Sequence, residues 1–268
     1  MSSTRYIFLL AFLISSVSCR KIITLDLNNA AKRLVVEANL TDLQGGCSVL
    51  LSQTGNFDAD NNFPPVSGAV VTITDEAGVA TKLTESSPGT YAAPGLVGQK
   101  GVTYRLLVIA GGDTIRSVST MPEKVNFDEL TITADQILGN TRQVANVFYA
   151  DPEDAGHYYQ FVQWKNGVKV KQIYTADNEL TAGRPQDVKL YIYGSDTKDK
   201  DRLQSGDDVQ VEMQCLDEAA HKYWFSAEQS ATGSNNNSVP TNPVSNLQGN
   251  ALGVFSVHTS QTRTVKVP

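Results

Sequence analysis

Residues that carry metal or thiol chemistry are scarce in this chain of 268 residues, which has only three cysteines and three histidines. His157, His221 and His258 are far apart, and none has a second histidine or a cysteine at a spacing typical of metal ligands. No nucleophile elbow, phosphate-binding loop, dinucleotide fingerprint or zinc-protease motif occurs. The sequence therefore predicts no catalytic residue, no metal site and no cofactor, and we expect that the protein is not an enzyme.

Clustered positive charge is also missing. Lysines and arginines number 22 against 28 aspartates and glutamates, which gives a formal net charge of −6 at pH 7. Binding to a phosphate backbone needs lysines and arginines that are gathered into a patch or a stripe. We therefore expect no nucleic-acid partner.

Long apolar runs are limited to one, Tyr6–Ile14 near the N-terminus, and Arg5 precedes it. A helix needs about 20 residues to cross a bilayer, so this run is too short for a transmembrane segment. A positive charge, a short apolar core and then small residues are typical of a secretory signal. We therefore predict a signal peptide over residues 1–18.

The predicted signal peptide ends at a cysteine. The string "SVSC" resembles a bacterial lipobox, although Ser16 stands where the usual pattern has leucine. In a lipobox the cysteine thiol receives a diacylglycerol and becomes the first residue after cleavage, and several acyl chains together anchor a protein stably. The resemblance implies a lipid anchor at Cys19 and a tether over residues 19–32. The alternative is a plain secretory signal with an incidental cysteine.

The two remaining cysteines, Cys47 and Cys215, have two interpretations. Export to an oxidising compartment would permit a disulfide between them. The alternative is that both are buried thiols, which pack as small apolar side chains. They lie in different predicted domains, and a disulfide needs the two Cα atoms within about 7 Å, so the buried thiols are the favoured interpretation.

Short β-rich segments, separated by turn signals, make up most of the chain. In "GAVVTITDEAG" the apolar Val71 and Ile73 alternate with Thr72 and Thr74. Alternation of this kind is typical of a strand with one buried face. Many such strands with glycine turns predict an antiparallel β-sandwich over residues 33–122.

A second β-rich domain is predicted over residues 123–268. Asn166 and Gly167 lie between two β-rich runs and indicate a two-residue hairpin turn, because both residue types tolerate a positive φ. The fold class is therefore mainly β, with two antiparallel β-sandwich-like domains, the second of which has one packed α-helix.

The predicted helix lies near residues 217–231. Asp217 is suited to cap its first turn. Apolar residues at helical spacing, such as Ala220 and Tyr223, would pack on a sheet, and Trp224 and Phe225 would widen that apolar face. Packing in the core is favoured over an aromatic ligand site for these side chains.

Longer strings carry two resemblances. Residues 66–120, with "VSGAVVTITDEAG" and "VTYRLLVIAGGD", resemble transthyretin-like or carboxypeptidase-regulatory-like β-sandwiches, which support and bind but do not catalyse. The strings "SCRKIITLDL", "YADPEDAGHYYQF", "CLDEAAHKYWFSAEQ" and "NPVSNLQGNALGVFSVHTSQTRTV" resemble a family of Bacteroidetes lipoproteins of unknown function over nearly the full length. The family resemblance implies an association with TonB-dependent outer-membrane receptors and gives no residue a role.

Two polar loops, residues 55–65 and 232–250, are the candidate contact regions for a ligand or partner. Their amides and carboxylates suit hydrogen bonds to glycans or peptides. The residues that we single out are Asn56, Asp58, Asp60, Asn62, Asn235, Asn236 and Asn242. The first loop begins like an oxygen-ligand calcium loop, but Phe63 stands where the sharp-turn glycine belongs and no glutamate closes the loop. We therefore expect no calcium site there.

Two function hypotheses follow. In the first, the protein is a lipid-anchored accessory or binding protein that cooperates with a TonB-dependent nutrient-uptake receptor and contacts a glycan or a peptide. In the second, it is a structural or adhesive cell-envelope lipoprotein without a small-molecule ligand. Both place the body at the outer membrane, on its periplasmic face or at the cell surface. Acidic residues directly after the anchor are a surface-export cue, and Arg20 and Lys21 occupy those positions, which favours the periplasmic face.

The lipid anchor can be tested by one substitution. Cys19→Ser removes the thiol that would accept the diacylglycerol, so we expect the variant to move from the detergent phase to the soluble fraction on membrane fractionation. A variant that still partitions wholly into detergent would contradict the lipoprotein interpretation.

Overall fold

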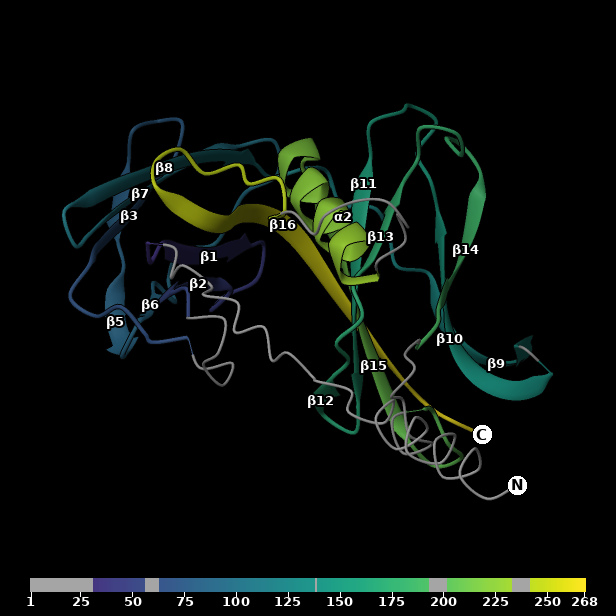
Figure 1. Ribbon diagram of the computed structural model, residues 1–268. Helices are drawn as coiled ribbons and strands as arrows, with labels where there is room; N and C mark the ends of the chain where they lie inside the picture. The colour runs from purple at the N-terminus through teal and green to yellow at the C-terminus, as the bar shows by residue number, and fades with distance from the viewer. Residues whose placement is uncertain (1–30, 56–62, 138, 193–201, 233–241) are drawn as a thin grey trace, which may run out of the picture. The chain divides into compact units, whose positions relative to one another are not determined.

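The computed structural model describes residues 31–55, 63–137, 139–192, 202–232 and 242–268 (Figure 1). The predicted signal peptide, Cys19 and most of the predicted tether lie outside the described residues. Among the described residues, no helix is long and apolar enough to cross a membrane. The described part is mainly β and has one helix, which confirms the predicted fold class.

The first β-sandwich has two facing groups of strands. One group runs in the order β1-β2-β6-β5, and the other in the order β4-β3-β7-β8. The bounds are β1 (Leu34–Thr41), β2 (Cys47–Gln53), β3 (Val70–Thr74), β4 (Ala80–Lys82), β5 (Thr84–Ser87), β6 (Thr90–Ala92), β7 (Thr103–Ala110) and β8 (Asp113–Thr120). The alternation predicted for β3 is confirmed, since Val71 and Ile73 are buried while Thr72 and Thr74 are partly exposed.

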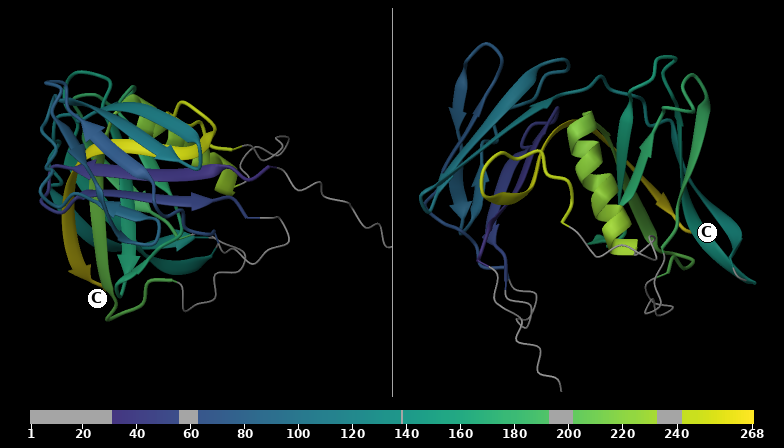
Figure 2. Two further views of the ribbon diagram at one scale, coloured as in Figure 1. Left: turned by 90° about the vertical axis from the view of Figure 1, so that its left-hand side faces the viewer. Right: turned by 45° about the horizontal axis from the view of Figure 1, so that its top comes forward.

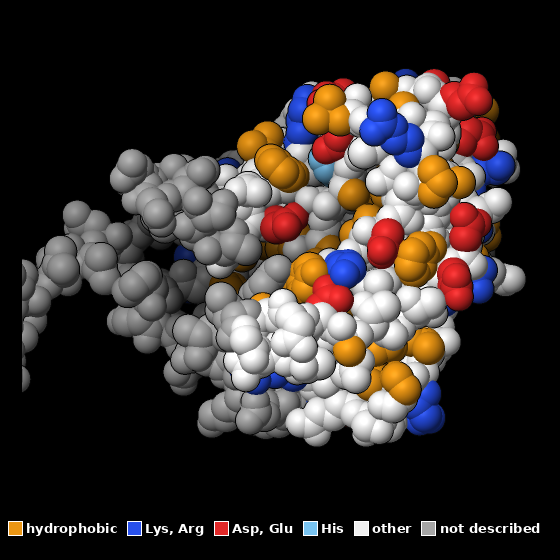
Figure 3. All heavy atoms as spheres, turned by 90° about the vertical axis from the view of Figure 1, so that its right-hand side faces the viewer, with side chains coloured by type: hydrophobic (Ala, Val, Ile, Leu, Met, Phe, Trp, Pro, Cys, Tyr) orange, Lys and Arg blue, Asp and Glu red, His pale blue; other side chains and the backbone are white. Residues whose placement is uncertain are grey.

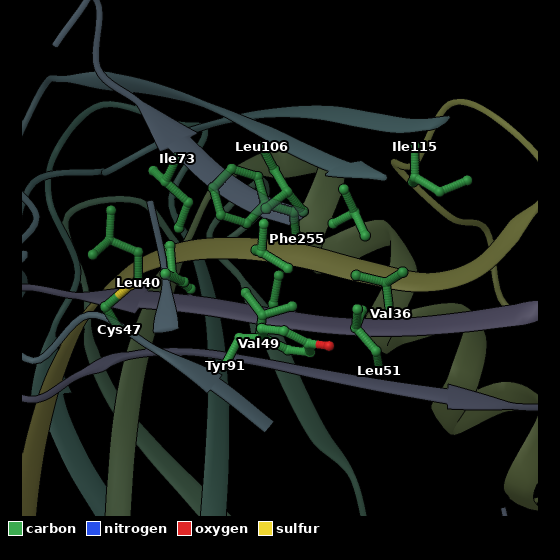
Figure 4. Packing of buried hydrophobic residues seen from close by; sticks show 14 of the residues in the cluster. Val36, Leu40, Cys47, Val49, Leu51, Ile73, Tyr91, Leu106, Ile115 and Phe255 are labelled. Carbon is green, nitrogen blue, oxygen red and sulfur yellow. The ribbon is translucent and has the colours of Figure 1, made fainter. Parts of the chain in front are cut away.

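Apolar side chains from both groups of strands form the core of the first sandwich. Figure 4 shows Val36, Val49 and Leu51 from β1 and β2 in the same cluster as Ile73 and Leu106 from the opposite group. Every one of these five side chains is at most 2% exposed. Full burial of such a side chain contributes about 1.5–3 kcal/mol, so this cluster is the main source of stability in the sandwich.

The second β-sandwich packs a three-stranded sheet, β14-β10-β9, against β11, β13 and β15. The bounds are β9 (Glu129–Ile137), β10 (Asn140–Ala150), β11 (Tyr158–Lys165), β12 (Val168–Lys169), β13 (Tyr174–Asp177), β14 (Pro185–Leu190) and β15 (Asp208–Leu216). The hairpin turn predicted between β11 and β12 is confirmed, because Lys165 pairs with Val168 and both Asn166 and Gly167 have a positive φ.

The last strand, β16 (Ala251–Lys266), belongs to both sandwiches (Figures 1 and 2). Its first half pairs with β1 in parallel, and its second half pairs with β15 in antiparallel. The predicted domains place all of β16 in residues 123–268, whereas its Phe255 and Val257 lie in the core cluster of the first sandwich. One sheet of nine strands therefore runs through both sandwiches.

The pairing of β16 with β1 depends on a glycine. Gly253 has a φ of +112°, and a Cβ at this position would lie 2.0 Å from the carbonyl oxygen of Val36. Only glycine has no Cβ, so only glycine lets the two backbones approach so closely in this conformation.

A hydrogen-bonded junction lies at the middle of β16. Asp217 Oδ1 accepts from the backbone N–H of Ala220, which caps the helix, while Oδ2 accepts from Ser119 Oγ at 2.6 Å and from the N–H of Thr120. Ser119 Oγ in turn accepts from the N–H of Val257 in β16. One carboxylate therefore connects the start of the helix to β8 and, through Ser119, to β16.

The helix α2 (Glu218–Thr232) begins directly after Asp217, as predicted. Ala220 is fully buried, and Tyr223 and Trp224 are partly buried against Leu216 and Val254. The prediction that Phe225 joins this apolar face is wrong, because its side chain is 48% exposed. Each residue of a helix turns about 100° from the last, so the residue after Trp224 already points toward solvent.

The two cysteines of the described part are free thiols, so the disulfide interpretation is wrong. Cys47 lies in the core cluster of the first sandwich and Cys215 in that of the second. Burial raises the pKa of the Cys47 thiol to about 11, and burial also raises the pKa of Cys215. Both side chains therefore stay protonated and pack as small apolar groups.

We predict that Asp217→Ala destabilises the protein by about 2–3 kcal/mol. The substitution removes a helix cap, which contributes about 1 kcal/mol, and leaves the polar groups of Ser119 and Thr120 without an acceptor. Urea unfolding would measure the change, with the exposed neighbour Glu218→Ala as a control that we expect to leave the midpoint nearly unchanged. Equal midpoints for both variants would contradict the role of the junction.

Candidate functional site

Most of the predicted contact residues lie outside the described part of the chain, so their role as contacts is not tested. Asn56, Asp58, Asp60 and Asn62 lie outside the described residues, as do Asn235 and Asn236. Asn242 is described and exposed. The calcium interpretation therefore stays untested, while the stems of both loops, residues 63–66 and 242–250, can be examined.

Two of the three histidines, His221 and His258, are buried and occupy structural positions. His258 Nδ1 lies 2.9 Å from Ser256 Oγ, and both side chains are at most 2% exposed. Burial lowers the pKa of His258 and of His221, so both rings stay neutral near pH 7. A serine beside a histidine suggests hydrolase chemistry, but these two lie on one strand and neither lines a described cleft. The described residues also contain no cluster of three or more histidine, cysteine, aspartate or glutamate side chains that could hold a metal ion.

A shallow cleft lies directly beside the stem of the first polar loop. Its volume is about 200 Å³. Its lining residues come from β1, β2, the segment after the loop, the turn before β6 and the first residue of β6: Glu37, Leu50, Leu51, Ser52, Phe63, Pro65, Pro88, Gly89 and Thr90. We call this set the loop-stem cleft.

Strand pairing sets the floor of the loop-stem cleft. Glu37 on β1 lies directly opposite Leu50 on β2, and Leu50 lies directly opposite Thr90 on β6. These three side chains point away from the core, since alternate residues of a strand face opposite sides. The Leu50 side chain is 46% exposed. The floor thus has an apolar side chain with a carboxylate on one side and a hydroxyl on the other.

The wall of the loop-stem cleft is fixed by backbone hydrogen bonds. The N–H of Gln53 donates to Pro64 O, and the N–H of Val66 donates to Leu51 O at 2.9 Å. The segment therefore continues the edge of β2 beyond the end of β6. Phe63, at the loop end of this segment, is 55% exposed.

Two side chains, Tyr91 and Glu85, hold the wall of the loop-stem cleft through hydrogen bonds to its backbone and to the adjacent turn. The Tyr91 hydroxyl, in the core, donates to Val66 O and accepts from the N–H of Ala69. The Glu85 carboxylate accepts from the N–H groups of Gly68 and Gly89, and these bonds hold the pKa of Glu85 below its usual range. The carboxylate is charged at neutral pH, which strengthens both bonds.

The loop-stem cleft is suited to bind rather than to react. It combines exposed apolar surface from Phe63 and Leu50, rigid prolines and one carboxylate, Glu37. Aromatic side chains at the surface contact sugar rings and peptide side chains at a low cost in conformational entropy, because only two side-chain torsions become restricted. No nucleophile and base are paired among its lining residues.

Sequence reasoning placed the contact region in the first loop but missed the residues of the cleft. A usable signal for Phe63 was its place before two prolines, Pro64 and Pro65, which rigidify a loop end. The exposure of Leu50 had no usable signal, because Leu50 and Leu51 are adjacent and apolar and only the strand phase separates the exposed side chain from the buried one.

The described stem of the second loop is structural. The Asn246 amide donates to Phe255 O and accepts from the N–H of Phe255, so it replaces a neighbouring strand along the first half of β16. Gln248 pairs with Arg116 of β8 through two backbone hydrogen bonds. The stem therefore supplies hydrogen-bond partners for the edges of β16 and β8.

We predict that Gly89→Ala disrupts the loop-stem cleft and destabilises the protein by more than 3 kcal/mol. Gly89 has a φ of +73°, and a Cβ there would lie 2.6 Å from Leu51 O and 2.7 Å from Pro65 Cβ. Gly78 is the matched control, since it also has a positive φ but a Cβ there would meet nothing within 4 Å. Gly78→Ala should cost about 1–2 kcal/mol for the left-handed conformation alone. Thermal unfolding would compare the two, and equal losses would contradict the steric argument.

Comparison with known proteins gives a family without a known function. No curated protein matches the chain. A solved segment of two fibronectin type III domains from chicken tenascin is similar at 15% identity, over 68% of this chain and 88% of that chain, with a TM-score of 0.21. A TM-score this low supports no conclusion about this chain. The profile of a domain of unknown function, DUF4249, matches residues 20–264. The chain therefore belongs to the DUF4249 family.

Proposed function

We propose that this protein is a lipid-anchored accessory protein of the outer membrane, which uses the loop-stem cleft to hold a peptide or glycan segment for a TonB-dependent receptor. The lipobox-like string that ends at Cys19 supports the anchor. The resemblance of the sequence to envelope lipoproteins supports the receptor as partner. One observation supports the binding role most directly: the loop-stem cleft exposes Leu50 in its floor and Phe63 in its hydrogen-bonded wall.

The rigidity of the wall supports binding over simple coverage of the surface. A surface whose backbone is already fixed loses less freedom when a partner binds, so more of the contact energy appears as affinity. Phe63 follows the polar loop directly, and Pro64 and Pro65 limit the motion of its backbone. A structural lipoprotein without a ligand would have no need for such a fixed apolar cleft.

Affinity purification of the full chain from native outer membranes tests this proposal. We expect an outer-membrane receptor barrel to co-purify with the parent chain. Phe63→Ser should reduce its recovery about tenfold or more, as is typical when a central aromatic contact is lost. Phe63 is exposed, so the variant should unfold at the same temperature as the parent.

Leu180→Ser is the matched control. Leu180 is 89% exposed and lies after β13 in the second sandwich, away from the residues of the loop-stem cleft. We expect this variant to recover the receptor as well as the parent does. If no receptor co-purifies with the parent, or if both variants lose it equally, the proposed role of the cleft is wrong.

A further inference from the structure

The outer face of β4-β3-β7-β8 is cationic and aliphatic, which sets it apart from the rest of an acidic chain. Strand pairing brings Lys82, Thr72, Leu107 and Arg116 into one row across the four strands. The next row contains Thr74, Arg105 and Val118, and the row on the other side contains Val70, Ile109 and Thr114. None of these outward positions carries an acidic side chain. We call this surface the cationic sheet face.

Aliphatic side chains on the cationic sheet face are exposed. Val70 is 41% exposed, Ile109 43% and Val118 51%. Leu107 lies between them at the floor of a shallow cleft of about 300 Å³, with Arg105 and Arg116 at its sides. Aliphatic side chains that are grouped at the surface and flanked by cations are typical of an interaction surface.

The three cations of the cationic sheet face are unpaired. Lys82, Arg105 and Arg116 form no ion pair with a carboxylate anywhere in the described part of the chain. Several other cations of the described part do pair with carboxylates, such as Lys189 with Asp135 and Lys222 with Glu218. Figure 3 shows the contrasting side near β9 and β14, where acidic, basic and hydrophobic side chains are interspersed.

We propose that the cationic sheet face docks on the anionic headgroups of a lipid bilayer. The unpaired cations would contact phosphate groups, and the aliphatic side chains between them would lie against the boundary of the acyl chains. This inference rests on the proposed lipid anchor, which would keep the body close enough to the bilayer for a weak surface contact to persist.

The spread of the cations favours a bilayer over a single small anion or a glycan. Lys82 and Arg116 are at opposite edges of their row, three strand spacings or about 14 Å apart, so one small anion cannot contact both. A bilayer presents phosphates at every such position. Sugar rings usually stack on aromatic side chains, and the cationic sheet face has none.

Vesicle co-sedimentation of the Cys19→Ser chain tests the proposal independently of the lipid anchor. The probes are vesicles of phosphatidylcholine alone and vesicles that contain one phosphatidylglycerol for every two phosphatidylcholines. We expect binding to the anionic vesicles only, and weaker binding at high salt because exposed charges are screened. Removal of one cation should weaken binding about fivefold, so Lys82→Gln, Arg105→Gln and Arg116→Gln together should weaken it about a hundredfold.

A matched control has three exposed cations of the second sandwich replaced, Lys169→Gln, Lys171→Gln and Arg184→Gln, with the same change in net charge. We expect this control to bind anionic vesicles as the parent does. Equal binding of both triple variants, or no binding of the parent, would overturn the proposal. The proposal would also be overturned if the first triple variant bound vesicles as the parent does but no longer recovered the receptor. That result would instead indicate that the cationic sheet face binds an acidic protein. Failure of the anchor alone would show in membrane fractionation and not in this assay.

Discussion

The structure depends on the position of β16 between β1 and β15. One edge of its first half is paired with β1, and the opposite edge is satisfied by side chains, with Asn246 beside Phe255 and Ser119 beside Val257. Beyond the end of β1, the Asp42 carboxylate replaces β1 as the partner of β16 and accepts a hydrogen bond from the N–H of Ser260 at 2.8 Å. A buried N–H without an acceptor costs about 1–3 kcal/mol, so each of these polar side chains is needed where a strand partner is missing.

The loop-stem cleft uses the same principle on a smaller scale. β6 covers only part of the edge of β2, and the segment around Pro64 completes it. Because a proline lacks an N–H, Pro64 and Pro65 can continue an edge as acceptors without a donor that would face solvent or another chain. The hydrogen bonds that complete the edge of β2 therefore also fix the backbone directly after the exposed Phe63.

Local features of this fold were predictable from sequence, and distant pairings were not. The alternation at Val71 and Ile73 and the turn at Asn166 depend only on neighbouring residues. Asp217 was recognisable as a helix cap, but its bond to Ser119 joins segments that only the tertiary fold brings together. The loop-stem cleft was predictable only as a region, because the exposure of Leu50 depends on which face of β2 meets the core.

The central place of the last strand has a consequence for folding. Arg33, just before β1, bonds to Ala251 over a separation of 218 residues, and the same strand supplies Phe255 to the core of the first sandwich. The first sandwich is therefore incomplete until β16, which begins 218 residues after Arg33, has been synthesised. Contacts between such distant residues slow folding, because a long loop must close before they form. Both sandwiches therefore complete their folding together, when β16 pairs with β1 on one side and with β15 on the other.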